Sequence, residues 1–297
     1  MTRNIQVQVV NAFIAGEEGG NPAGVVLNAD SYSEVEMQAI AANVGMSETA
    51  FVSQSKTEAF KLDFFTPNRR IDHCGHATIA TFSYLAELGL VSEGQSSKET
   101  VDGPRKIIIK DHDAYMEQLA PKYKFPENWK EVNVTVEDVL LSVGLGNEDL
   151  DERVSPVLVN TGNNFIVIGV ENEEILKNLQ PNFKQISDIS EKLDLIGYYI
   201  FTTNTKEDNI QATTRMFAPH YAIEEEAATG MAAGPLACVL HDFLNVSEDK
   251  IRIEQGRFMS PISPSLITAE LSVDNGKITG LMVGGKGKVA KTINVEF

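Results

Sequence analysis

The sequence lacks any long apolar run. No segment of its 297 residues approaches the roughly 20 uninterrupted apolar residues that a membrane-spanning helix needs. The chain starts with Met1-Thr2-Arg3-Asn4-Ile5, which does not contain the apolar core of a signal peptide. We therefore expect a cytoplasmic protein with no membrane partner.

Cysteine and basic residues are also scarce. Cys74 and Cys238 are the only cysteines, and their number and spacing do not indicate a disulfide framework. The 25 Lys and Arg residues are outnumbered by 42 Asp and Glu, which gives a net charge of −17. So acidic a body does not attract nucleic acid or an anionic membrane surface. An anionic small molecule remains a candidate partner where local dipoles or cations outweigh the overall field.

The sequence does contain a short polar loop that leads directly into a helical pattern. The loop Asp72-His73-Cys74-Gly75-His76 precedes residues 77–88, whose apolar positions have helical spacing. The first turn of a helix leaves backbone N–H groups without intrahelical partners, and the helix dipole adds partial positive charge there. This helix start is therefore suited to hold a carboxylate or a phosphate.

The same arrangement recurs in the second half of the chain. In both halves the order is Phe-x-Pro, an apolar residue, Cys or Thr before Gly, a small residue and Leu. The matched positions are Phe65 to Pro67, Ile71, Cys74-Gly75, Ala77 and Leu85, against Phe217 to Pro219, Ile223, Thr229-Gly230, Ala232 and Leu240. The repeat predicts two lobes, 1–125 and 126–284, with the tail at about 285–297 returning to the first. We expect helices 77–88 and 231–243 to begin at one shared cleft.

Several local signals predict the elements around these loops. Ser33-Glu34-Val35-Glu36 has the form of a capping box, and Gly45 can end the helix that follows. Residues 16–24 are rich in glycine but lack the spacing of a phosphate-binding loop, so we interpret them as a turn. Residues 91–129 are polar, and we interpret them as irregular except for a strand at 106–110.

The cluster of Asp72, His73, Cys74 and His76 contains residue types that bind metals. Adjacent residues of a short loop cannot all turn toward one ion, and no partner pair with zinc spacing follows, so we predict no metal site. Cys74 alone is either a thiolate of low pKa at a helix start or a small buried side chain; the sequence leaves both open.

Glu48 lies between the end of the helix that starts at Ser33 and an apolar strand at 49–52. A carboxyl group held near apolar walls has a raised pKa, as a general acid or base at neutral pH requires. We therefore expect the pKa of Glu48 to be raised.

A set of motifs resembles the signature of the PhzF (phenazine-biosynthesis) family over nearly the whole chain. They are Gly20-Asn21-Pro22-Ala23-Gly24, Ser47-Glu48-Thr49-Ala50-Phe51, Phe65-Thr66-Pro67, Cys74-Gly75-His76-Ala77-Thr78, Arg215-x-Phe217-Ala218-Pro219 and Ala228-Thr229-Gly230. The resemblance implies an α+β fold of diaminopimelate-epimerase type, with two pseudo-symmetric lobes that each wrap a mixed sheet around a central helix. It also implies no metal and no organic cofactor, and a homodimer.

The resemblance assigns roles to individual positions. The catalytic glutamate of the family falls on Glu48 and its cleft histidine on His76, with Glu226 as an assisting group. The substrate-binding positions carried over are Asn21, Cys74, Gly75, Thr229, Gly230 and Met231. Where the family usually has Asp, Pro and Ser, this chain has Glu226, Ala227 and Met231. These departures point to a substrate other than that of the phenazine pathway.

The function expected is therefore that of a cofactor-independent isomerase. Glu48 would move a proton between carbons of a small cyclic carboxylate, because such a step needs one base that reaches both carbons and a fixed anion site. One alternative is a thiol-dependent epimerase or racemase, with Cys74 and Thr229 in the places of two facing thiols. Another is a PhzF-like protein that has lost its chemistry and serves in interactions.

Overall fold

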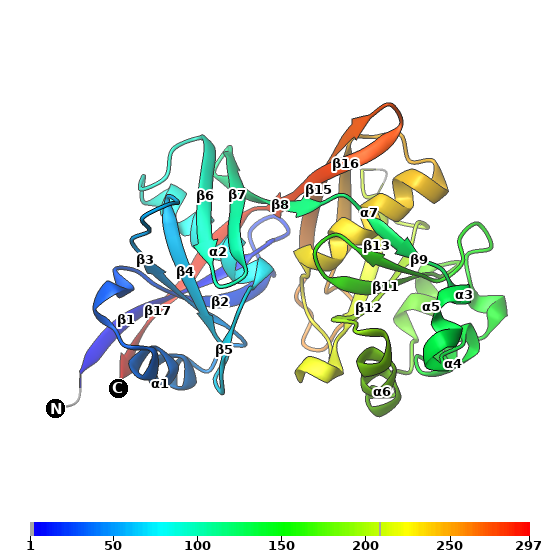
Figure 1. The fold of residues 1–297 in the computed structure, drawn as a ribbon, viewed down its shortest axis with the longest axis horizontal. Helices are drawn as coiled ribbons and strands as arrows, with labels where there is room; N and C mark the ends of the chain where they lie inside the picture. Colours follow the sequence, from blue (N-terminus) through cyan, green and yellow to red (C-terminus); the bar gives the residue numbers. More distant parts are fainter. Residues whose placement is uncertain (1–2, 208) are drawn as a thin grey trace. The chain divides into compact units, whose positions relative to one another are not determined.

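The computed structural model describes residues 3–207 and 209–297; residues 1–2 and 208 lie outside the described part. The chain divides into two compact units, the first comprising 1–117 and 284–297 and the second 118–283. Each unit is described by itself. Figure 1 shows that both combine strands with few helices.

The first unit is built from nine strands and two α-helices among its described residues. The strands are β1 (Asn4–Ala12), β2 (Asn21–Val26), β3 (Thr49–Ser53), β4 (Phe60–Phe65), β5 (Arg70–Ile71), β6 (Gly94–Thr100), β7 (Gly103–Lys110), β8 (Asp113–Leu119), which ends in the second unit, and β17 (Gly287–Glu296). The helices are α1 (Glu34–Val44) and α2 (Gly75–Glu87). β17, near the end of the chain, pairs antiparallel with β1.

The second unit has a larger set of helices. Its strands are β9 (Lys122–Lys124), β10 (Val157–Asn160), β11 (Asn164–Gly169), β12 (Gly197–Thr202), β13 (Ala212–Phe217), β14 (Lys250–Gln255), β15 (Ser265–Asp274) and β16 (Lys277–Gly285). Its α-helices are α3 (Pro126–Trp129), α4 (Val136–Leu141), α5 (Glu173–Lys177), α6 (Phe183–Leu193) and α7 (Gly230–Leu244). Short 3₁₀ turns occur at Lys130–Val132, Asn147–Asp149 and Pro219–Tyr221 in this unit, and at Ala29–Ser31 in the first unit.

The strand pairing is the same in the two units. In the first, β1 pairs antiparallel with β2, β2 parallel with β3, β3 antiparallel with β4, β4 parallel with β6, and β6 antiparallel with β7. In the second, β10 to β15 pair in the same alternation. The long helix lies between the fourth and fifth strands of each series, as α2 and as α7. The predicted two-lobed α+β fold is therefore confirmed.

The helix α2 is the centre of the first unit. It contacts β1, β2, β3, β7 and β17, and all its residues from Gly75 to Ser83 are buried. Small residues make this close packing possible, because a side chain added at Gly287 of β17 would meet the side chain of Ser83. The sequence placed the start of this helix two residues too late.

The capping box is confirmed. The hydroxyl of Ser33 accepts a hydrogen bond from the Glu36 N–H, and the Glu36 carboxylate accepts one from the Ser33 N–H. Gly45 ends α1 with φ of 67°, a left-handed conformation that favours glycine. This cap fixes where the chain leaves α1 and turns toward Glu48.

Two sequence interpretations were wrong. Residues 21–24 belong to β2 and do not form a turn. The strand tolerates Pro22 because Pro22 pairs with β1 only; pairing with β3 starts at Gly24. Residues 91–129 are not irregular, since they contain β6 to β9. β6 has the sequence GQSSKET, which has no apolar alternation, and its pairing with β4 and β7 decides its structure.

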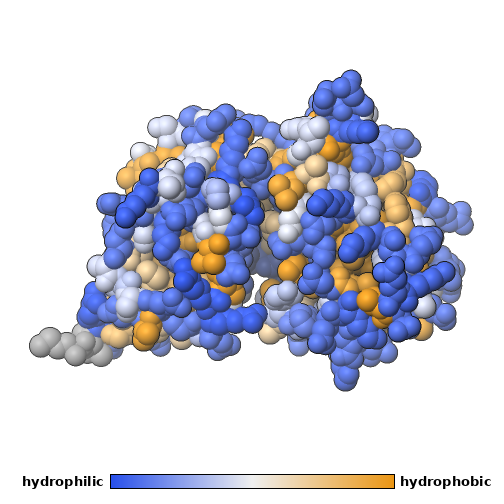
Figure 2. All heavy atoms as spheres, in the orientation of Figure 1, coloured by the Kyte–Doolittle hydropathy of each residue, from blue (hydrophilic) through white to orange (hydrophobic). Residues whose placement is uncertain are grey.

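No helix among the described residues is both long and apolar enough to cross a membrane. On the face drawn in Figure 2, hydrophilic residues cover most of the surface of each unit and the apolar patches are small.

Candidate active site

Glu48 follows the end of α1 and immediately precedes β3. Its backbone carbonyl accepts a hydrogen bond from the Gly24 N–H at 2.9 Å, which ties the residue to β2. Glu48 is only 7% exposed. The carboxyl group is thus held on a short, anchored segment and largely removed from water.

His76 and Cys74 lie at the start of α2, where Cys74 is the N-cap residue. The His76 Nε2 is 3.1 Å from the Glu48 Oε2, and the His76 Nδ1 is 3.6 Å from the Cys74 Sγ. All three side chains are buried. The imidazole of His76 therefore lies between a carboxyl group and a thiol. The structure brings together Glu48, Cys74, Gly75 and His76, four of the residues that the sequence analysis assigned to one site.

The expectation of a raised pKa for Glu48 is wrong in its direction. Burial does raise the pKa of this carboxyl group, but the charge of His76 and hydrogen bonds from His76 and Ser47 together hold the pKa below its usual value. The sequence argument counted the apolar walls and missed the imidazole opposite the carboxyl group. At neutral pH Glu48 is therefore a carboxylate, the form that accepts a proton.

The pKa of the Cys74 thiol is shifted in the opposite direction, above its usual value. Burial raises its pKa, and the negative charge of Glu48 raises it further, while His76 opposes both effects. Of the two readings left open by the sequence, the structure favours a protonated, buried side chain over a low-pKa thiolate. In this cluster the carboxylate is the more available base.

The same three side chains offer an oxygen, a nitrogen and a sulfur atom within 4.8 Å of one another, a set that can hold a metal ion. The sequence argument against a metal considered only residues of one loop. Glu48 comes from a separate segment, so that argument did not weigh this set. His73, by contrast, turns to Lys98.

The first turn of α2 adds a feature for binding. Cys74 carries no side-chain oxygen with which to cap the helix, and the backbone N–H groups of the first turn have no intrahelical acceptor. Together with the helix dipole they favour an anion. A carboxylate group of a substrate is a suitable anion for this position.

In the second unit, a hydrogen-bonded network holds the residues of the corresponding loop. Thr229 is the N-cap of α7, and its hydroxyl donates to the carboxylate of Glu226. The Gln255 Nε2 donates to the Glu226 carbonyl at 2.7 Å and to the Thr229 Oγ1 at 3.2 Å. The Gln255 Oε1 accepts from the Thr229 N–H at 3.1 Å and from the Tyr199 hydroxyl at 2.9 Å.

The sequence did not single out Gln255 or Tyr199. Both are fully buried, at the end of β14 and within β12, and neither belongs to a motif. Gln255 holds Glu226 and Thr229 through these hydrogen bonds, and Tyr199 in turn holds Gln255. Only a knowledge of which strands neighbour the loop would have identified them.

The remaining predicted positions lie at the ends of elements. Gly230 is the first residue of α7, and its carbonyl accepts a hydrogen bond of 2.9 Å from the Gln118 side chain. Met231 follows it and is half-buried, and Asn21 is buried at the start of β2. The predicted residues thus form two groups, one in each unit. Glu48, Cys74, Gly75 and His76 lie in the first unit, as does Asn21, and Glu226, Thr229, Gly230 and Met231 lie in the second.

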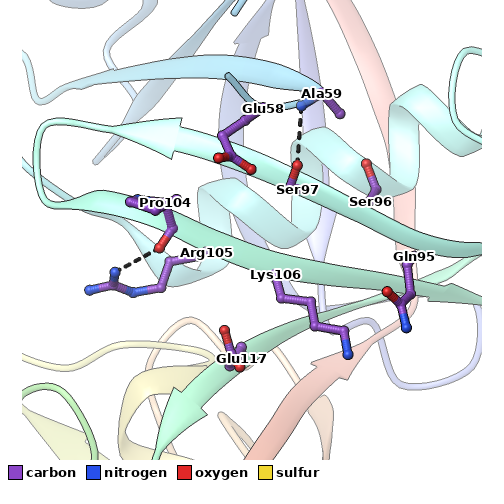
Figure 3. Close-up of a pocket in the computed structure, with 9 residues that line it drawn as sticks. All are labelled: Glu58, Ala59, Gln95, Ser96, Ser97, Pro104, Arg105, Lys106 and Glu117. Atoms are coloured by element: carbon purple, nitrogen blue, oxygen red, sulfur yellow. Dashed lines mark hydrogen bonds between the residues drawn. The ribbon is translucent and has the colours of Figure 1, made fainter. Parts of the chain in front are cut away.

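A recess of about 540 Å³ on the first unit lies apart from this cluster. It is lined by Glu58, Ala59, Gln95, Ser96, Ser97, Pro104, Arg105, Lys106 and Glu117, and none of the predicted site residues lines it (Figure 3). The Arg105 side chain donates to the Pro104 carbonyl and to Asp102, so its charge is already partnered. The recess adds nothing to the candidate active site.

Comparison with known proteins places this chain in a family. The family model described as "Phenazine biosynthesis-like protein" matches residues 10–291. An uncharacterized isomerase of Clostridium acetobutylicum is 31% identical over 296 residues, covering 97% of each chain. A PhzF family protein of Bacillus anthracis has a crystal structure with a TM-score of 0.88, 27% identity and 99% coverage of both chains.

A more distant structure shows how far the fold extends. A hydroxyproline epimerase from Agrobacterium vitis superposes with a TM-score of 0.61 at 11% identity, covering 99% of this chain and 91% of its own. At that identity the likeness concerns the fold alone. The match of the family model over nearly the whole chain, with the relatives above, shows that this chain belongs to the PhzF, phenazine-biosynthesis-like family.

Proposed function

We propose that this protein is a cofactor-independent isomerase that moves a proton between two carbons of a small, cyclic carboxylate. The observation that carries the proposal is the buried contact of 3.1 Å between Glu48 and His76 at a helix start suited to an anion. The naming of relatives such as the Clostridium acetobutylicum protein as isomerases supports the reaction class.

The proposed reaction follows from the states of the three side chains. Glu48 is held as a carboxylate, so it can accept a proton from a substrate carbon and become a carboxylic acid. His76 compensates the charge of the carboxylate before the transfer, and the burial of the cluster keeps bulk water from hydrating the carboxylate. Glu48 then gives a proton to a second carbon, which restores the carboxylate. Between the two steps the Glu48 carboxyl group exchanges its proton with solvent, so that in D₂O the second carbon receives deuterium.

The anion site has a separate task in this account. The first turn of α2 orients the substrate carboxylate, so that one base can reach both carbons. Glu226 is the proposed assisting group, and Asn21, Thr229, Gly230 and Met231 are proposed to contribute to substrate binding. The variant Glu226→Asp tests the role proposed for Glu226.

The test is a screen of small cyclic carboxylates in D₂O with the wild-type protein, followed by NMR. The proposal predicts loss of a substrate C–H signal and appearance of deuterium at a second carbon. It also predicts that dialysis against a chelator leaves the exchange unchanged, because proton transfer by Glu48 uses no metal. Carboxylates that bind without any exchange would instead support the non-catalytic interaction protein.

A second candidate is the thiol-dependent epimerase or racemase. It is favoured by the contact of 3.6 Å between Cys74 and His76, in which an imidazole could take the thiol proton. The raised pKa of Cys74 opposes it. Rapid labelling of Cys74 by iodoacetamide at neutral pH, with loss of exchange on labelling, would replace the carboxylate mechanism with this one.

A further inference from the structure

Lys98 is a lysine with no exposed surface, and it lies on β6 in the first unit. Its Nζ donates a hydrogen bond of 2.6 Å to the Thr78 hydroxyl and lies 3.3 Å from the His73 Nδ1. The ammonium group is also 5.1 Å from the centre of the Phe64 ring. These contacts come from β4, from the loop before α2 and from α2 itself.

Two of these contacts lead directly to the candidate active site. Thr78 donates its own hydroxyl proton to the Cys74 carbonyl at 2.6 Å, so Lys98 is linked through Thr78 to the N-cap of α2. His73 immediately precedes Cys74 in the chain. Lys98 thus holds the turn that carries Cys74 and His76 from both of its ends.

The electrostatic surroundings do not favour a charge at this position. Among the described residues, Lys98 has no ion pair with a carboxylate; the titratable groups that act on its pKa are Cys74, Arg105 and Asp102. Burial, opposed in part by Cys74 and Asp102, lowers the pKa of Lys98 to about 7. Removal from water, together with Lys98 and Arg105, also lowers the pKa of His73 well below its usual value, so His73 is neutral and accepts the hydrogen bond.

A lysine in this state is costly to the fold. A buried ammonium group without a carboxylate loses hydration that neutral hydrogen-bond acceptors replace only in part. An apolar side chain of similar length would fill the same space without that cost. The stability of the first unit therefore does not account for a lysine here, whereas a role at the neighbouring site does.

We propose that Lys98 is a positioning residue of the active site, which acts through Thr78 and His73 to fix the turn that presents His76 to Glu48. This inference rests on the proposed function for its effect on turnover, but the positioning itself has consequences that need no substrate.

The first test compares stability with activity in Lys98→Met. We expect a melting temperature equal to or above that of the wild type, and a gain that is larger at pH 6 than at pH 9. The sign follows because the wild-type lysine is charged in both folded and unfolded states below its folded pKa, so the full cost of burial is present there. That cost disappears as the pH rises from about 7 toward the unfolded pKa.

Turnover should fall in the same variant, by about tenfold, as expected when a hydrogen bond from a charged group is lost. If Lys98 were only structural, Lys98→Met would lose stability and activity together. A lower melting temperature at pH 6 therefore contradicts the inference.

A matched pair of threonines tests the link. Thr78→Val removes the hydroxyl that joins Lys98 to Cys74. Thr81→Val makes the same change one turn later, where the hydroxyl donates to the Ala77 carbonyl and, among the described residues, to no other group. Both threonines are fully buried. We expect Thr78→Val to reduce turnover by about tenfold and Thr81→Val to leave it within about twofold. Thr78→Ser, which keeps the hydroxyl, should restore turnover.

The last test uses no substrate. The chain has five histidines. We would follow their ring signals by NMR, with His73→Gln and His76→Gln to assign two of them. We expect the His73 signal to shift near pH 7 in the wild type but not in Lys98→Met, and the His76 signal to move in Thr78→Val but not in Thr81→Val. A His73 signal that is flat from pH 6 to 8, or a His76 signal indifferent to Thr78→Val, would overturn the positioning role. These results stand whether or not the isomerase is confirmed.

Discussion

The starts of α2 and α7 occupy the same place in two repeated units, yet they differ in chemistry. At α2, a carboxyl group from a separate segment meets an imidazole and a thiol, and all three groups are buried. At α7, the carboxylate of Glu226 comes from the same loop and accepts a hydrogen bond from the N-cap hydroxyl of Thr229, which the amide of Gln255 holds in turn.

The difference indicates how two units of the same fold can have different roles in one reaction. The cluster at α2 is made of groups that exchange protons, and its carboxylate is charged at neutral pH. The network at α7 consists mainly of hydroxyl and amide groups, which hold a geometry without changing protonation. This difference supports the proposal that the first unit transfers the proton and that the second binds the substrate and assists.

The same small change in both units gives the largest expected difference. Glu48→Asp withdraws the carboxyl group by one methylene from His76, and Glu226→Asp does so from Thr229. A misplacement of about 1 Å at a reacting group can cost about 10²-fold, so we expect that loss of kcat for Glu48→Asp. Glu226→Asp should change kcat by less than about threefold, because Glu226 does not carry the proton. Equal losses in steady-state kinetics would remove the asymmetry.

His76 can be tested by the pH dependence of turnover. In His76→Gln the carboxyl group of Glu48 remains buried but loses the charge that lowers its pKa, so its pKa rises. A general base must be ionised, and the acid limb of the kcat/KM profile should therefore move to higher pH, with kcat lower by about tenfold or more. An acid limb that stays where it is in the wild type would mean that His76 does not act on Glu48.

Cys74→Ala should have the smallest effect of this series. The thiol is buried and protonated in our account, so its removal costs packing, about 1 kcal/mol in free energy of unfolding. We expect kcat within about threefold of the wild type, because no proton is assigned to the thiol. Urea denaturation and deuterium exchange measure the two quantities. Loss of all exchange would transfer the role of base to Cys74.

The sequence was sufficient to predict the two repeated units and the loops that precede α2 and α7. The repeat predicted two like units, and the caps at Ser33 and Gly45 predicted the helix that precedes Glu48, because these signals are local. That the two helix starts lie at one shared cleft stays a prediction, as do the homodimer and the cytoplasmic location. The family membership follows from motifs that are spread over nearly the whole chain.

What the sequence could not provide is the environment of each group. The pKa of Glu48 depends on an imidazole 28 residues away in the chain, and its direction was misjudged because only the adjacent apolar strand was visible. Lys98 was overlooked because β6 has no apolar pattern, so nothing indicated that this lysine is buried. Such contacts depend on tertiary structure, which local patterns do not specify.

The central claim is that the carboxylate of Glu48 takes the proton from the substrate. The most direct measurement is incorporation of deuterium at a substrate carbon in D₂O, comparing the wild type with Glu48→Gln at equal occupancy of the site. Gln keeps the size and the hydrogen bonding but cannot accept the proton, so binding should survive while exchange falls by about 10⁴-fold, at the upper end of general acid–base effects. Exchange by Glu48→Gln at a rate near that of the wild type would show that Glu48 is structural and that the base is Cys74 or Glu226.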